Sequence, residues 1–211
     1  MSYASVADLR AEGVLEVEAS DERLEALLEE ATTTIDRMAG WWFEPRETTL
    51  RMDGRGTPSI EPPVPPIRID SLSVGGSQLS LDPDDIVVVG APVPPGFAAP
   101  RITLTRGGFP RGRGNVELDG LFGYTEDDGT PEGRVPREIR RACLLMVLMW
   151  IPPLASSDAD EARHSWRVTS MRTRDQSVSF ANPGLGGMYL SDPDIDRILR
   201  RYRRPAGLGA A

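Results

Sequence analysis

Apolar residues recur at helical spacing early in the chain, at Leu24, Leu27, Leu28, Ala31, Ile35 and Met38. Ser20 or Asp21 can cap this segment, and Gly40 suits the left-handed residue that follows a helix. The pattern predicts an amphipathic helix. Its opposite face is charged and solvated, and carries Glu25, Glu29 and Glu30.

A second segment, from Ala142 to Ile151, is apolar on every face. Pro136 suits the first position of a helix, and Pro152 prevents the helix from continuing past Ile151. A membrane span needs about 20 apolar residues, roughly twice this run. The pattern therefore predicts a core helix that other elements surround, with the apolar stripe of the 24–38 segment as its partner.

Two further helices have marked ends. Ser5 and Asp8 resemble a capping box, and Gly13 ends the short helix that they begin. Near the C-terminus, Asp192 can cap a helix that starts at Pro193. The apolar stripe of this last helix is Ile195, Ile198, Leu199 and Tyr202, and its negative end carries Arg200, Arg201, Arg203 and Arg204.

Between residues 48 and 124 the apolar period changes from helical to alternating. Short strand signals stand at Leu50 and Met52, Ile67 and Ile69, Leu79 and Leu81, Ile86 to Val89, Ile102 and Leu104, and Val116 to Tyr124. Glycine pairs, the 82–85 segment and many prolines separate them. This region predicts a small antiparallel sandwich or barrel inserted between helices.

The expected fold class is therefore α+β. A small helical bundle, built from the N- and C-terminal segments, carries an inserted antiparallel β-rich domain and an extended C-terminal arm. We divide the chain into N-terminal helices (1–47), the β-rich domain (48–126), the core helix (134–153), and a loop, arm and helix for partner docking (154–211).

Composition excludes several kinds of function. The 211 residues carry a net charge of −8, which disfavours general binding to DNA. All 24 basic residues are Arg, so neither a Schiff base nor a phosphate-binding lysine can form. A lone Cys143 and the lack of an N-terminal apolar segment indicate synthesis in a reducing cytoplasm.

No group of residues points to catalysis. His164 is the only histidine and stands in a polar loop, while Cys143 is expected to be a small inert hydrophobe. One Cys and one His cannot form a zinc site. The glycine-rich 107–114 segment lacks the Gly-Lys-Ser/Thr of a phosphate loop and is read as a hairpin loop. We therefore expect no enzyme activity, no cofactor and no metal.

Two features suit binding to another protein. Arg111 and Arg113 lie at the tip of the 107–114 loop, where they could touch an acidic partner. In the 41–43 segment, one aromatic ring is expected in the core, while an exposed Trp42 would suit an interface.

Several segments together resemble the head–tail connector, or adaptor, proteins of long-tailed double-stranded DNA bacteriophages and related gene transfer agents. Their order carries the resemblance, which covers most of the chain. The matching segments are Val6–Arg10, Ile35–Phe43, Leu50–Gly56, Gly114–Tyr124, Val135–Ala142 and Thr169–Ser179.

The resemblance implies a structural virion protein that is assembled in the host cytoplasm and resides in the neck, between capsid and tail. It implies a ring of about twelve copies beneath the portal, with heterologous contacts between neighbours. The ring extends the DNA channel, through which DNA passes without tight binding. The implied partners of the ring are the portal protein and the next neck or tail protein, which is a stopper or a tail terminator. No binding to a membrane is implied.

Within this family C-terminal segments dock on the portal. The residues that we expect at the portal or between subunits are Trp166, Val168, Met171, Arg172, Arg174, Ser177, Val178, Phe180, Arg200, Arg201, Arg203 and Arg204. Those that we expect at the neck or tail partner are Arg111, Arg113 and Trp42.

An alternative function is a host- or carbohydrate-binding β module of a phage tail or other structural assembly. Exposed aromatic residues in the β-rich region would favour it, and Phe97 and Phe109 are the loop aromatics there. An enzyme is the third reading.

Overall fold

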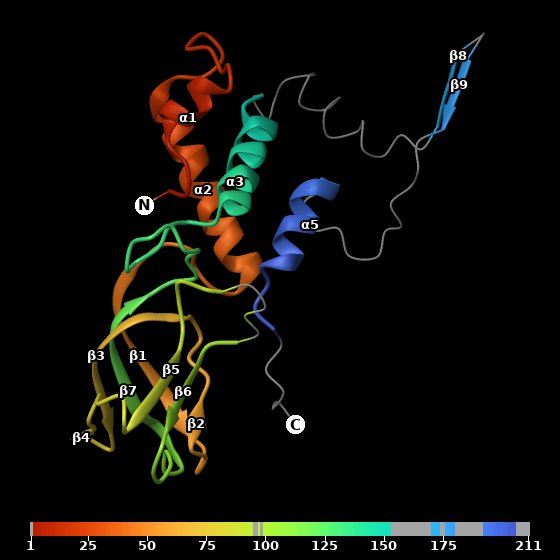
Figure 1. Ribbon diagram of the computed structural model, residues 1–211. Coiled ribbons are helices and arrows are strands. Elements are labelled where there is room, and N and C mark those ends of the chain that lie inside the picture. The colour runs from red at the N-terminus through yellow and green to blue at the C-terminus, as the bar shows by residue number, and fades with distance from the viewer. Residues whose placement is uncertain are drawn as a thin grey trace. The chain divides into compact units, whose positions relative to one another are not determined.

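The computed structural model describes residues 2–94, 97, 99–152, 170–173, 176–179 and 192–205 (Figure 1). The chain divides into a helical unit, residues 1–38 and 137–202, and a β unit, residues 39–136 and 203–211. The helical unit is built from the two ends of the chain and the β unit from the middle. The predicted α+β class is therefore confirmed.

The helices of the helical unit begin and end close to the predicted residues. Among the described residues they are α1 (Val6–Ala11), α2 (Asp21–Ala39), α3 (Arg137–Trp150) and α5 (Pro193–Arg201). Ser5 and Asp8 form the predicted capping box at α1, each side chain bonding the other residue's backbone N–H. Gly40, just after α2, has a φ of +81°, as expected for the residue that ends a helix.

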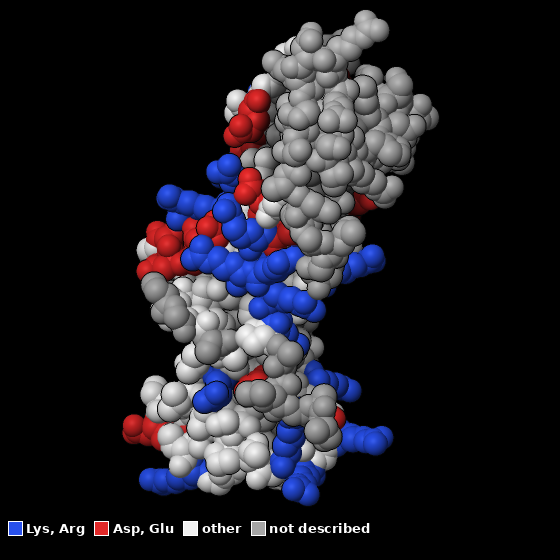
Figure 2. Space-filling model, turned by 90° about the vertical axis from the view of Figure 1, so that its right-hand side faces the viewer, with Lys and Arg blue, Asp and Glu red and all other residues white. Residues whose placement is uncertain are grey.

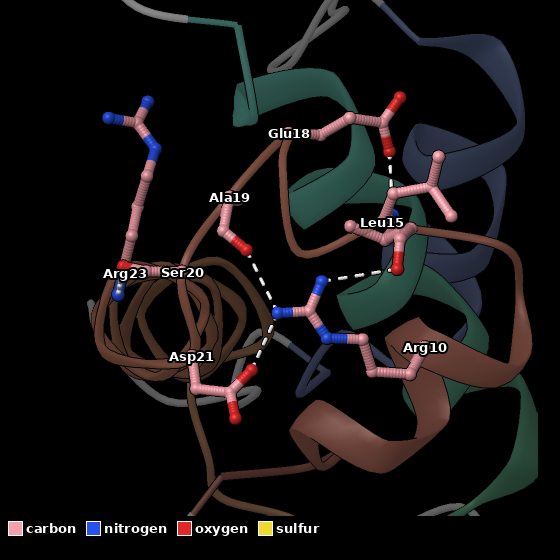
Figure 3. Close-up of polar contacts among 8 residues, drawn as sticks. Arg10, Leu15, Glu18, Ala19, Ser20, Asp21 and Arg23 are labelled. Carbon is pink, nitrogen blue, oxygen red and sulfur yellow. Dashed lines mark hydrogen bonds and ion pairs between the residues drawn. The ribbon is translucent and has the colours of Figure 1, made fainter.

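The loop between α1 and α2 is held by Arg10 (Figure 3). Its guanidinium donates to the carbonyls of Val14 and Ala19 at 3.1 and 2.9 Å, and pairs with Asp21 at 2.6 Å. Within the loop, the Leu15 N–H donates to Glu18 at 2.8 Å. One side chain thus ties the loop to the start of α2, because these carbonyls have no helical donor.

The core of this unit lies between α2 and α3. Leu24, Leu28, Ala31 and Ile35 on α2 are buried, as are Ile139, Ala142, Cys143, Met146 and Val147 on α3. The Cys143 thiol lies in hydrogen-bond contact with Thr32 of α2, and the Tyr3 N–H donates to the same Thr32 hydroxyl at 3.2 Å. The predicted pairing of the α2 stripe with the core helix is confirmed.

The expectation that α3 is covered on every face is wrong. Leu148 is 37% exposed, and its neighbours Leu144, Leu145, Met149 and Trp150 are only half-buried. The described helices of this unit pack against one side of α3, where Ile139, Cys143 and Met146 recur at helical spacing. An all-apolar composition therefore does not mean all-round burial here.

The β unit contains two described antiparallel sheets. One has the strand order β1-β7-β3-β4 and the other β2-β6-β5. The strands are β1 (Arg46–Gly54), β2 (Ser59–Ile60), β3 (Pro66–Val74), β4 (Ser77–Gln78), β5 (Ile86–Val89), β6 (Arg101–Leu104) and β7 (Gly112–Phe122). Val116, Leu118 and Phe122 of β7 are fully buried, so the core of this unit lies against β7.

The predicted turns before β4 and before β5 are confirmed. Gly75 and Gly76 both have positive φ and join β3 to β4 in a two-residue loop. In the turn before β5, the Asp85 N–H donates to the Asp82 carbonyl at 2.8 Å.

Three predicted features of the β region are wrong. Leu79 and Leu81 lie outside any strand, because β4 pairs for only two residues after its turn. Tyr124 lies beyond the end of β7. The 107–114 segment is no hairpin loop, because it joins β6 to β7, which belong to different sheets. Phe109 lies buried in this crossing and bonds Thr57 through its N–H at 2.9 Å.

Between α3 and α5 in the chain, β8 (Ser170–Thr173) and β9 (Gln176–Ser179) pair antiparallel with each other. These strands fall in the predicted extended arm. We call them the arm strands.

The first testable prediction concerns Gly90, which follows β5. The Ala91 N–H donates to the Pro66 carbonyl at 2.8 Å, and a Cβ on Gly90 would lie 1.9 Å from that same oxygen. Gly90→Ala should therefore lower the free energy of unfolding by about 2 kcal/mol, measured in urea. Gly107→Ala is the control: its Cβ would meet nothing within 4 Å, and only its φ of +77° is unfavourable. We expect the control to cost about 1 kcal/mol. Equal losses would contradict the close approach.

Candidate interaction surfaces

Helix α5 is anchored on α3. Asp192 caps it, accepting from the N–H groups of Asp194 and Ile195 at 2.8 and 3.1 Å, and Pro193 stands at its first turn. Ile195, Ile198 and Leu199 are buried. The predicted apolar stripe and cap are confirmed, so α5 belongs to the packed helical unit.

A charged groove of about 420 Å³ lies where α5 meets α3, lined by Glu138, Arg141, Asp194, Arg197, Ile198 and Arg201. Arg201 pairs with Glu138 at 3.0 Å and Arg197 with Asp194 at 3.0 Å. Both pairs are exposed, so solvent screens them and each contributes little to stability. The groove presents paired arginines to solvent. Figure 2 shows one face of the molecule, on which arginine side chains (blue) gather beside acidic ones (red).

The predicted portal-facing arginines have different surroundings. Arg200, Arg201, Arg203 and Arg204 are all exposed. Arg201 meets a carboxylate of its own chain, Glu138, where we expected one from a partner. The Arg204 N–H donates to the Ala39 carbonyl at 2.7 Å, which fixes its backbone to the end of α2 within the β unit.

The remaining arm residues lie on the arm strands or outside the described residues. Met171 pairs with Val178, and Arg172 with Ser177, in the register of β8 and β9. The predictions for Trp166, Val168, Arg174 and Phe180 lie outside the described residues, as does that for His164.

The aromatic 41–43 segment is largely built into the β unit. Trp41 and Phe43 are buried and both pack against the Tyr124 ring, with centroids 5.0 and 5.6 Å away. Trp42 is half-buried: its Nε1–H donates to the Phe122 carbonyl at 2.8 Å. The Arg46 guanidinium lies 5.4 Å from the Trp42 ring centroid. Two rings, not one, therefore pack in the core.

Arg111 and Arg113 are both exposed, Arg111 before the start of β7 and Arg113 within it. The loop aromatics that a sugar-binding module would need are not presented to solvent as a platform. Phe109 is fully buried, and Phe97 packs edge-on against Tyr124 at 5.9 Å.

The pKa shifts of Cys143 and Asp8 have structural causes. Burial raises the pKa of the Cys143 thiol to about 11, against the smaller lowering effect of its contact with Thr32. The pKa of Asp8 is lowered: desolvation opposes the shift, and bonds from Ser5 and Arg140 outweigh it. No group of His, Cys, Asp and Glu among the described residues could hold a metal ion. In that same part of the chain, no helix is long and apolar enough to span a membrane.

Sequence reasoning missed two exposed apolar surfaces. Leu15 and Val17, in the loop held by Arg10, are 59% and 89% exposed. Val87, Val88 and Val89 of β5 are each more than 40% exposed. The valine run was predicted as a strand. Its position at the edge of a sheet depends on pairing with residues 101–104, and no local sequence signal indicates that pairing.

No family model matches the sequence, and no curated protein matches it. Solved structures share its fold. A chain from the neck of a native gene transfer agent particle, computed with C12 symmetry, gives a TM-score of 0.58 at 15% identity, over 97% of this chain and 90% of that chain. A chain from the neck of the empty particle, computed with C6 symmetry, gives 0.57 at 16% identity, over 97% and 91%.

A chain from the virion of the native gene transfer agent gives a TM-score of 0.56 at 15% identity, over 97% of this chain and 91% of that chain. The resemblance to gene transfer agent connector proteins, inferred from sequence segments, is thus confirmed at the level of the fold.

The second prediction separates the forces that hold α5. Leu199→Ala removes a buried side chain and should lower the free energy of unfolding by about 3 kcal/mol. Arg201→Ala breaks the exposed pair with Glu138 and should cost less than about 1 kcal/mol. Urea denaturation of both variants measures the difference. A larger loss for Arg201→Ala would mean that charge, not apolar packing, anchors the helix.

The third prediction concerns pH. Because the folded state raises the pKa of Cys143 from 9.0 to about 11, the thiol proton is held more tightly when the protein is folded. Its contribution to stability is complete below pH 9 and is lost as the pH rises toward 11. Between these values the wild type should lose about 2 kcal/mol more than Cys143→Ala, measured by urea unfolding at each pH. Parallel pH profiles would contradict this account.

Proposed function

We propose that this protein is a head–tail adaptor: a structural neck component that forms a ring under a portal, extends the DNA channel and offers a surface to the next neck or tail protein. The observation that carries the proposal is the fold shared with chains of gene transfer agent necks over nearly the whole length of both proteins. A match of that extent includes both the helical unit and the inserted β unit.

The same comparison also supports a proposal for the number of copies. The neck to which this chain is similar was computed with C12 symmetry, so we propose a ring of twelve. Each subunit of such a ring presents two different surfaces to its neighbours, because ring contacts are heterologous.

Helix α5 and the arm strands are held differently, which supports a different role for each. Its buried Ile195 and Leu199 tie it to the helical unit. The arm strands precede α5 in the chain and pair only with each other in the part that the structure describes. An isolated two-stranded sheet is at best marginally stable in water, so these strands are suited to join a partner. We therefore propose that the arm strands dock on the portal and that α5 attaches them to the helical unit.

DNA passage favours a wall that repels phosphates. The net charge of −8, repeated around an axis, supplies a field of that sign. Glu25, Glu29 and Glu30 are exposed on α2 and are our candidates for this wall. The other acidic candidates, Asp158, Asp160 and Glu161, lie outside the described residues. We assign the exposed arginines to acidic protein surface, where their planar groups can pair carboxylates.

The fourth prediction tests docking. Replacing residues 170–179 with a Gly-Ser linker keeps α5 and its buried contacts, and should leave the melting temperature within a few degrees of wild type. The variant should no longer co-sediment with tail-less capsids that carry the cognate portal, because the strands that join the portal are gone.

The matched control replaces residues 127–131, an exposed turn of the β unit, with a Gly-Ser linker of equal length. This control should co-sediment as the wild type does. Co-sedimentation of the 170–179 variant at wild-type level would place the docking site elsewhere.

The fifth prediction concerns DNA. In a gel-shift titration at low salt, the isolated protein should not bind duplex DNA below micromolar concentration. The opposite outcome is submicromolar binding that is lost when four arginines are replaced by Ala: Arg200, Arg201, Arg203 and Arg204. That outcome would show that these arginines bind DNA. Such binding would also weaken steeply with salt, by about one power of concentration per phosphate contact.

A further inference from the structure

Strand β5 ends its sheet and is open on one side. In the order β2-β6-β5, β6 is its one strand partner within the described residues. The Thr105 N–H donates to the Asp85 carbonyl at 3.0 Å, and Val87 pairs with Thr103 in the same register. Bonded pairs in an antiparallel ladder alternate, so the backbone of Val87 faces β6 and that of Val88 faces the opposite, open side.

The backbone groups on the open side are mostly unused. The Ile86 N–H donates to the Asp82 carbonyl at 3.0 Å. The Ile86 carbonyl and both backbone groups of Val88 have no backbone partner in the described ranges. Val88 therefore offers one donor and one acceptor side by side, the set that a residue of a bonded antiparallel pair needs.

The surface around this edge is apolar. Val87, Val88 and Val89 are 49%, 43% and 43% exposed. Beside them lies a groove of about 200 Å³ lined by Pro66, Ile67, Arg68, Ile69, Leu81, Ile86 and Val88. Edge strands usually carry charges or proline against unwanted pairing, as β1 does with exposed Glu47, Arg51 and Asp53. The residues of β5 itself, Ile86–Val89, include no charged residue and no proline.

Charge marks one end of the edge. Asp82, Asp84 and Asp85 form the exposed turn that leads into β5. The one cation that lines the groove, Arg68, is already paired with Asp70 and Glu47, at 2.7 Å each. The start of β5 is therefore acidic, and a basic side chain of a partner complements it.

We propose that β5 binds an extended segment of another protein by strand addition. The segment pairs with Val88, places apolar side chains two residues apart against the valines and the groove, and sets an arginine beside the Asp82–Asp85 turn. A second copy of this chain is a poorer occupant, because β1, the long edge strand of the other described sheet, carries charges where β5 needs apolar side chains. This site does not depend on the neck role.

The test uses the full-length protein and a fluorescein-labelled peptide in which valine and threonine alternate before an amidated C-terminal arginine, which antiparallel pairing places at the start of β5. Binding is followed by fluorescence anisotropy. Val88→Pro removes the outward N–H and leaves the bonds to β6 intact. It should weaken binding by at least about tenfold. Val88→Ala, the matched control, keeps the N–H and should bind within about threefold of wild type.

A charge variant covers the case in which Val88→Pro fails to fold. Asp84→Arg changes an exposed side chain of the turn. It should weaken binding of the arginine peptide about tenfold and improve binding of the same peptide with glutamate in place of that arginine. The proposal is overturned if the wild type binds neither peptide, or if folded Val88→Pro binds as the wild type does. It is also overturned if Asp84→Arg leaves the peptide preference unchanged, or if light scattering shows that β5 pairs copies of this chain with each other.

Discussion

The β unit depends on the pairing of β7 on both of its sides. Strand β7 takes β1 along one edge and β3 along the other, and its Val116, Leu118 and Phe122 are fully buried. Gly120 permits this close arrangement, because a Cβ there would lie 2.3 Å from the Arg68 carbonyl oxygen. Once β7 holds the centre, the remaining strands of its sheet are placed outward, and β1 becomes an edge.

In the helical unit α3 has the corresponding role. Its buried side receives α2, with Cys143 against Thr32. Helix α5 also packs against α3, and its Ile195 and Leu199 are buried. Residues from the two ends of the chain therefore share one core, and the β unit is inserted between them. A consequence is that α5 cannot be removed as a tail, since its loss would expose apolar side chains of the core.

The sequence predicted the elements whose signals are local. Caps at Ser5 and Asp192, the Gly75–Gly76 turn and the apolar stripe of α2 all lie where the pattern placed them. The features that were predicted wrongly depend on distant partners. Whether α3 is covered at Leu148 is decided by other helices, and whether the 107–114 segment is a hairpin is decided by which sheet β6 joins.

The dependence on distant partners makes the interaction surfaces even harder to predict from sequence. Arg201 could be recognised as a basic residue at a helix end, but its partner Glu138 is 63 residues away. The open edge of β5 has no sequence signal beyond the valine run, because an edge is defined by the strand that is absent from its side. Residue type was therefore predictable at these sites, and pairing was not.

The two kinds of surface differ in what they can contribute to assembly. Exposed ion pairs such as Arg201–Glu138 are screened by water and exchange partners at little cost, so they suit selection between partners more than tight binding. Apolar surface such as Val87–Val89 contributes about 25 cal/mol for each Å² that a partner removes from water. A segment that also hydrogen-bonds to the backbone of Val88 is bound in a defined orientation and register, because it can pair in only one register at a time. Of these two surfaces, the apolar edge of β5 is therefore the one suited to tight binding, and the charged groove is the one suited to discrimination between partners.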